Sequence, residues 1–150
     1  MRNPFIRIAV AMIAVVVVGG SVTVNIYATR ATPPTALTQP AWTLTTLVED
    51  AQEQALSSSH PATLRFDAHD SQITGSGGCN MFGGAYTLNA ARLQFSELRS
   101  TLIGCLDPVV SGQESHYLQA LSQVTTYRLE GNMLTLSDDS GRVQLTFRAS

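Results

Sequence analysis

The sequence contains no lysine, and charged residues of any kind make up only 13% of its 150 positions. Its nine arginines are spread thinly, so no basic stripe is present that could neutralise a row of phosphates. This scarcity argues against a nucleic-acid partner. Beyond Ala28, seven arginines stand against eleven acidic residues, a formal charge of −4. A charge of that size keeps a domain soluble and does not specify a partner.

The sequence also lacks the usual motifs for holding a cofactor or a metal. The stretch Gly75–Tyr86, GSGGCNMFGGAY, is rich in glycine. No Gly-Lys-Ser/Thr and no βαβ unit follow it, so it is neither a phosphate loop nor a dinucleotide fingerprint. The acidic runs Asp67–Asp70 and Asp138–Ser140 do not match a calcium loop, and two cysteines are too few for a zinc site. We therefore expect no cofactor and no metal, and we interpret the glycines as backbone turns, bulges or close approaches.

Cys79 and Cys105 are the only cysteines, and three interpretations of them are open. They could form a disulfide, remain two unpaired structural thiols, or supply a thiol nucleophile. A disulfide is favoured in an oxidising compartment, where closing the loop would stabilise the fold by about 3–4 kcal/mol in the chain-entropy model. A catalytic thiol needs a nearby base, and no spacing identifies any of the three histidines as that base: His60, His69 and His116.

The N-terminus has the features of a membrane-targeting segment. Arg2 and Arg7 precede an apolar run, and the mainly apolar stretch Ile8–Ala28 has about the 20 residues that a helix needs to cross a bilayer. One interpretation is a cleaved signal peptide, with cleavage after Ala28 or Ala31. The other is an uncleaved transmembrane helix that anchors the protein in the cell membrane. The arginines favour an inside N-terminus, so in both cases the remaining chain lies outside the cytoplasmic membrane.

Two further features concern attachment. No cysteine precedes Cys79, which disfavours a lipoprotein anchor. The segment Thr29–Ala41 contains three prolines and four threonines with little apolar content, so we expect an extended tether. The predicted organisation is therefore a signal or anchor over residues 1–28, a tether over 29–41 and one folded domain over 42–150.

Apolar and polar residues alternate along most of this domain from Ala62 onward. Such alternation between turn clusters predicts antiparallel strands with one buried face. The stretch Asp107–Val124 instead has apolar residues at helical spacing, with Ser111 and Glu114 in the pattern of a capping box. The predicted fold is α+β: a curved antiparallel sheet of about six to seven strands packed on one late amphipathic helix. The stretch Thr46–Ser59 stays ambiguous between strand, short helix and loop.

Taken together, these segments resemble the META domain, the family of the bacterial heat-shock protein HslJ. The resemblance rests on the stretch from Ile73 to Leu98, on STLIGC at Ser100–Cys105, and on the stretch from Glu114 to Phe147. Ile103-Gly104 replaces the Met-Ala that is usual in the family. The fold-signature positions are Gly78, Asn80, Gly83, Gly84, Tyr86, Thr101, Glu114 and Leu121, together with Cys79 and Cys105.

The resemblance implies a small α+β domain exposed in the bacterial cell envelope and linked to stress tolerance. It implies no catalytic residue, because no activity is established for the family. We therefore expect a non-enzymatic binding or structural module, on the outer face of the cytoplasmic membrane if anchored and periplasmic or secreted if cleaved. Its expected partners are the membrane, through the N-terminal segment, and an unknown envelope protein or lipid. Two alternatives remain: a carrier of a small hydrophobic ligand, and a thiol-dependent enzyme that uses Cys79 or Cys105.

Overall fold

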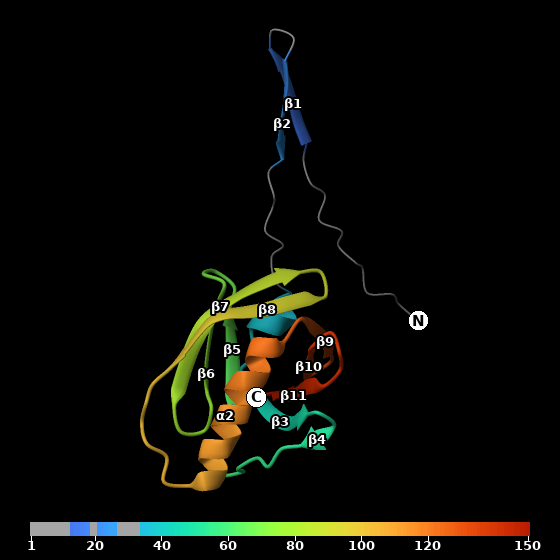
Figure 1. Ribbon diagram of the computed structural model, residues 1–150. Coiled ribbons are helices and arrows are strands. Elements are labelled where there is room, and N and C mark those ends of the chain that lie inside the picture. Colours follow the sequence, from blue (N-terminus) through green and yellow to red (C-terminus); the bar gives the residue numbers. More distant parts are fainter. Residues whose placement is uncertain (1–12, 19–20, 27–33) are drawn as a thin grey trace. The chain divides into compact units, whose positions relative to one another are not determined.

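The computed structural model describes residues 13–18, 21–26 and 34–150, which fall into two compact units, Met1–Thr32 and Pro33–Ser150 (Figure 1). In the first unit, β1 (Ile13–Val18) and β2 (Ser21–Ile26) form an antiparallel pair. The second unit contains the remaining elements.

The expectation of a helix over Ile8–Ala28 is wrong for the two stretches that the structure describes there, because both are strands. Their many valines and isoleucines have β-branched side chains, which favour extended backbone. Among the described residues, no helix combines the length and the apolar character needed to span a membrane. Arg2, Arg7 and the cleavage positions after Ala28 and Ala31 lie outside the described residues. The choice between signal and anchor therefore stays a prediction.

The second unit is built around one antiparallel sheet, which has nine strands among residues 34–150 rather than the expected six or seven. The extra strands come from the ambiguous stretch before Ala62, which forms a long strand, a two-residue strand and a loop. The strands are β3 (Trp42–Glu49), β4 (Gln52–Glu53), β5 (Thr63–Asp67), β6 (Gln72–Ser76), β7 (Met81–Asn89), β8 (Arg92–Ser100), β9 (Thr126–Glu130), β10 (Met133–Ser137) and β11 (Val143–Ala149).

The sheet closes on itself, which the sequence pattern did not predict. Each strand from β5 to β11 pairs with the next along the chain, and β11 also pairs with β3 over most of its length. β3 in turn pairs with β5, so eight strands form a ring, and β4 attaches to β3 outside it. Two joints of the ring are short. β3 meets β5 through two residue pairs, and β8 meets β9 through the single pair Arg92–Thr126.

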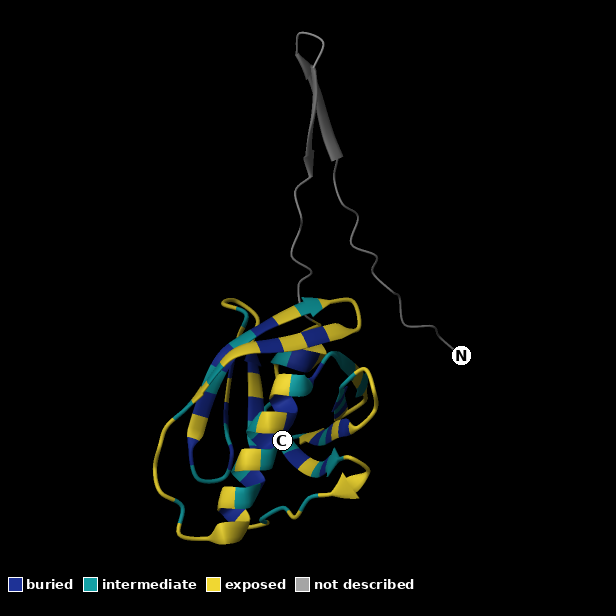
Figure 2. Cartoon of the chain, in the orientation of Figure 1, coloured by how far each residue is buried: buried dark blue, intermediate teal, exposed yellow. Residues whose placement is uncertain are grey.

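The helix α2 (Pro108–Gln123) covers the inner face of this curved sheet, and one side of it is buried (Figure 2). Tyr117 lies at its centre, with its ring 5.6 Å from Phe82 and 6.1 Å from Phe147 between centroids. All three side chains are buried. The prediction of an antiparallel sheet packed on a late helix is therefore correct in outline.

The start of α2 differs from the prediction. The helix begins at Pro108, and the Asp107 side chain caps it by accepting a hydrogen bond from the Val109 N–H at 2.8 Å. The expected capping box of Ser111 and Glu114 is wrong, because both residues lie inside the helix. Proline suits the first helical position, since the N–H that it lacks would have no helical partner there.

The compact unit also begins earlier than Trp42. A short helix, α1 (Thr35–Thr38), lies within the stretch that we expected to be a tether. Leu37 is fully buried, and its carbonyl accepts a hydrogen bond from the Trp42 indole N–H at 2.9 Å. The buried Leu37 side chain and this hydrogen bond dock the segment on the core.

Candidate functional site

The two cysteines form a disulfide, with an S–S distance of 2.06 Å and a Cα–Cα distance of 6.0 Å. The bond joins the turn between β6 and β7, which contains Cys79, to the segment between β8 and α2, which contains Cys105. We call the residues Thr101–Asp107 the Cys105 loop. Of the three interpretations left open by the sequence, the disulfide is confirmed. Both sulfurs take part in this bond and the sequence has no other cysteine, so the chain has no free thiol.

The side chain of Asn80 holds the Cys105 loop in place next to the disulfide. Its Oδ1 accepts hydrogen bonds from the Ile103 N–H at 2.7 Å and the Thr101 hydroxyl at 2.9 Å. Its Nδ2 donates to the Ile103 carbonyl at 3.2 Å. The amide thus satisfies both backbone groups of Ile103, much as a neighbouring strand would. Asn80 is buried, so these bonds are shielded from water.

Glu114, on α2, fixes the orientation of Asn80. Its carboxylate accepts hydrogen bonds from the Asn80 backbone N–H and from Nδ2, both at 2.6 Å. An ionised carboxylate accepts hydrogen bonds and donates none, so the amide nitrogen must face Glu114 and the amide oxygen must face the loop. The residue assigned to a capping box is therefore the link between α2 and the loop.

A second buried amide, Gln113, was not found by the sequence analysis. Its Nε2 donates to the carbonyls of His60 at 2.9 Å and Gly77 at 2.7 Å, and its Oε1 accepts from the Ser57 N–H at 2.7 Å. A signal for it exists in the sequence: Gln113 follows Val110 by three residues and precedes Tyr117 by four, so it lies on the apolar side of the helix. Gln113 therefore joins α2 to the segment before β5 and to the turn between β6 and β7. Glu114 joins α2 to Asn80 in the same turn.

The Cys105 loop presents apolar side chains to solvent. Leu102 is 98% exposed, Ile103 65% and Leu106 102%. We call these three residues the apolar tip. Figure 2 shows the segment between β8 and α2 as largely exposed, in contrast to the striped strands beside it. A shallow hollow of about 430 Å³ lies at the base of the loop, lined by His60, Gly78, Cys79, Gly104, Cys105, Leu106, Asp107 and Val110. Exposed apolar residues gathered on one ordered loop are a feature of interaction sites.

The structure brings only part of the predicted signature to this site. Gly78, Asn80, Thr101, Glu114 and the two cysteines meet there, and Gly78 has a φ of +117° that favours glycine. The remaining signature positions lie in the sheet or the core and not at this site. A side chain at Gly84 would lie 2.8 Å from the Ser96 carbonyl oxygen, opposite a bulge in β8, whereas Gly83 has more room. Tyr86 donates its hydroxyl to the Asp67 carbonyl at 3.1 Å, and Leu121 is fully buried.

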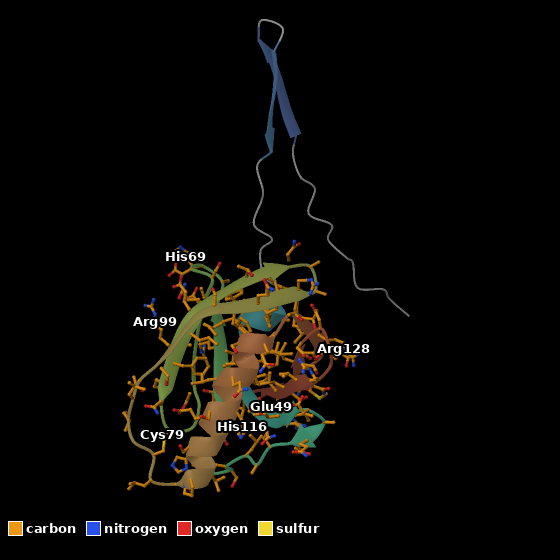
Figure 3. The ribbon with its side chains drawn as sticks, viewed as in Figure 1. Glu49, His69, Cys79, Arg99, His116 and Arg128 are labelled. Atoms are coloured by element: carbon orange, nitrogen blue, oxygen red, sulfur yellow. A yellow bond between two sulfur atoms is a disulfide. The ribbon has the colours of Figure 1, made fainter. Side chains whose placement is uncertain are left out.

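The three histidines have partners that do not involve sulfur. His116 Nδ1 lies 2.7 Å from a carboxylate oxygen of Glu49, and these two residues lie side by side in Figure 3. His60 Nδ1 lies 3.0 Å from the Ser59 hydroxyl. His69 pairs with Asp70 in the turn between β5 and β6, and this hydrogen bond raises the pKa of His69 above its ordinary value. These contacts give no histidine the role of a base beside a cysteine.

Comparison with known proteins identifies the family. A family model for the META domain matches residues 35–150. A protein from Burkholderia xenovorans, solved by NMR, superposes with a TM-score of 0.64 at 28% identity, over 76% of this chain and 83% of its own. A DUF4847-family protein from Bacteroides vulgatus superposes with a TM-score of 0.57 at 13% identity, over 75% of this chain and 93% of its own, which shows a common fold. No curated protein sequence matches the chain.

Proposed function

Because the chain belongs to the META-domain family, we propose that it acts as a non-enzymatic binding or structural module of the bacterial cell envelope. The Cys79–Cys105 disulfide carries this proposal. Disulfides form and persist in oxidising compartments, which for a bacterium lie outside the cytoplasmic membrane. The apolar N-terminal segment gives the chain a means of reaching that side. We expect the module to contribute to stress tolerance, as the family resemblance implies.

The arrangement around the disulfide supports binding rather than catalysis. A thiol-dependent enzyme needs a thiolate, and a bridged sulfur cannot supply one. The buried amides Asn80 and Gln113 and the partly buried Glu114 already have partners, and they hold backbone segments together. What the site leaves available to a partner is the apolar tip. The proposed binding element is therefore the Cys105 loop.

The packed core argues against the alternative that the domain carries a small hydrophobic ligand. A carrier would hold its ligand between the curved sheet and the helix. That position is filled by Tyr117, Phe82, Phe147 and Leu121, whose side chains are buried against one another. An apolar ligand would have to displace them at the cost of their packing.

The test is a topology reporter combined with thiol counting on the full chain. A reporter enzyme that is active only outside the cytoplasm is fused after Ser150, and the unfused chain is treated with an alkylating agent before mass measurement. We expect an active reporter, and no alkylation until the protein is reduced. A variant lacking residues 1–28 serves as the control and should lose reporter activity. A full-length fusion that is expressed but inactive, or two thiols that alkylate without reduction, would overturn the proposal.

A further inference from the structure

We propose that the apolar tip of the Cys105 loop inserts into the surface of a lipid bilayer, so that this META domain binds membrane directly through a second contact. The inference rests on the proposed function and names the ligand of the same loop. Its three side chains are Leu102, Ile103 and Leu106, and two of them are about as exposed as a side chain can be. The tip protrudes, and its aliphatic side chains suit the acyl-chain boundary of a bilayer.

The middle of the loop is prepared for an apolar environment. Backbone N–H and C=O groups that reach hydrocarbon must have partners inside the protein. Ile103, in the middle of the tip, has both groups bonded to Asn80. The disulfide at Cys105 and the Glu114 carboxylate hold that arrangement from below. At Ile103 the tip can therefore be buried without leaving a backbone group unpaired.

The composition of the tip disfavours a protein partner. The residues that contribute most of the binding energy at protein–protein interfaces are often Trp, Tyr or Arg, and leucine is under-represented among them. The tip contains no Trp, Tyr or Arg. A stable protein interface buries about 800 Å² on each partner through roughly 20–30 residues, whereas three side chains on one loop offer far less. A bilayer has no such minimum, since each inserted side chain contributes separately. The same shortage of area argues against a second copy of this chain.

The charge around the loop indicates which lipids it would prefer. The loop carries one acidic residue, Asp107, and no basic residue, and the chain beyond Ala28 has a formal charge of −4. Arg99 precedes the loop on β8 (Figure 3). Anionic lipids attract basic clusters, which this loop lacks. The inference is therefore insertion into neutral, zwitterionic lipid, with little dependence on salt.

The chain's own N-terminus gives an independent reason to expect a membrane nearby. The stretch Ile8–Ala28 is mainly apolar in sequence, which is typical of a membrane-targeting segment, and the two parts of it that the structure describes are strands. Weak membrane contacts usually act in pairs, because one contact keeps the other at high local concentration. If the segment stays attached, even a weak tip is sufficient to hold the domain on the surface.

The experiment places a tryptophan at the tip of the full chain. The protein has one tryptophan, Trp42, which is buried and therefore shielded from lipid. The variant Leu106→Trp and a matched control, Asn132→Trp in the exposed turn between β9 and β10, are reconstituted into phosphatidylcholine vesicles with brominated acyl chains. We expect brominated lipid to quench the Leu106→Trp fluorescence strongly and to leave wild type and Asn132→Trp nearly unchanged. Adding Leu102→Ser to Leu106→Trp should weaken the membrane contact roughly tenfold.

The outcomes separate this inference from the function on which it rests. Equal quenching of Leu106→Trp and Asn132→Trp would overturn membrane insertion, provided that the disulfide is closed and the variants unfold cooperatively. A blue shift of Leu106→Trp that depends on protein concentration and not on brominated lipid would overturn it in favour of a second copy of this chain. Either result leaves the proposed envelope function intact if the reporter is exported. A reporter held in the cytoplasm would overturn both the envelope function and the membrane insertion.

Discussion

Asn80 is a small neutral side chain, yet it connects three segments that are far apart in the sequence. It contacts Thr101 and Ile103 on the loop and Glu114 on the helix. The sequence marked it only as a fold-signature position of the family resemblance. Its partners are more than 20 residues away, so no local pattern could reveal them. Buried hydrogen bonds to a charged acceptor contribute more than exposed ones, which makes this residue a good place to test the site.

Replacing Asn80 with alanine should destabilise the domain by about 2–3 kcal/mol, because the partly buried Glu114 loses its side-chain donor and the Ile103 backbone loses both its partners. Denaturant unfolding of Asn80→Ala, Glu114→Ala and the double variant measures the coupling between the two residues. We expect a coupling energy of about 1–3 kcal/mol. Additive effects would show that the two side chains act independently and would contradict the network.

His69 offers a residue-scale test of electrostatics at the surface. The hydrogen bond from its ring to Asp70, and then the negative charges of Asp70 and Asp67, raise its pKa above the ordinary 6.5. In an NMR titration, His69 should therefore lose its proton at a higher pH than a free histidine does. Asp70→Asn should lower that pKa towards 6.5, while the distant Glu130→Gln should leave it in place. An unchanged titration in Asp70→Asn would disprove the pairing.

At the scale of elements, the glycines of the chain divide into those that the fold requires and those that it does not. A Cβ at Gly75, on β6, would lie 2.1 Å from the Thr63 carbonyl oxygen and 2.7 Å from the Phe82 ring. A Cβ at Gly112, inside α2, would meet nothing within 4 Å. The two positions therefore make a matched pair for the same substitution.

We expect Gly75→Ala to destabilise the domain by about 3 kcal/mol or more, because backbone and a buried ring would have to move. Gly112→Ala should instead stabilise it by about 0.5–1 kcal/mol, since alanine loses less backbone entropy than glycine in a helix. The denaturant midpoints of the two variants, compared with that of wild type, measure both stability changes. A mild effect at Gly75 would mean that β5 and β6 pack less closely than the structure shows.

The elements that the sequence predicted well are those with a strong local pattern. The hairpins after Ala62 alternate regularly, and α2 has a clear apolar stripe, so both were found. The stretch around Thr46 was ambiguous because β3 carries a bulge where it pairs with β11. A bulge shifts the alternation by one residue, and the pairing that corrects it comes from a strand about 100 residues later. The closed ring and the role of Glu114 depend on such distant pairings, which explains why they were missed.

At the scale of the whole molecule, the disulfide lies beyond the end of β8 that does not pair with β9. β8 pairs along its length with β7 but meets β9 only at Arg92, near its other end. The Cys105 loop leaves β8 after Ser100, at the end that β9 does not reach, and the disulfide joins the loop to the turn before β7. Replacing both cysteines by serine should cost about 2–4 kcal/mol of stability. Hydrogen exchange should then rise first in the Cys105 loop and at the start of α2. Uniform loss of protection would indicate that the bond stabilises the whole fold equally.

The buried Tyr117 should make the whole domain less stable at alkaline pH. It is fully buried and donates its hydroxyl to the Thr63 carbonyl at 3.0 Å, and burial raises its pKa well above the ordinary 10.0. Below pH 10 the phenol is neutral in both the folded and the unfolded chain, so its contribution to stability is complete. Above that pH the unfolded chain releases a proton that the folded chain retains. Stability should then fall by about 1.4 kcal/mol per pH unit, until the pH passes the raised pKa of the folded state.

The variant Tyr117→Phe isolates this effect from the other tyrosines. It removes the ionisable group and the hydrogen bond to Thr63, so it should cost about 1 kcal/mol at neutral pH. It should also lose the part of the alkaline decline that belongs to Tyr117. Denaturant unfolding of both proteins from neutral pH to above pH 10 therefore gives two curves that converge as the pH rises. Parallel curves would mean that the phenol ionises in the folded state, and that the space between sheet and helix admits water.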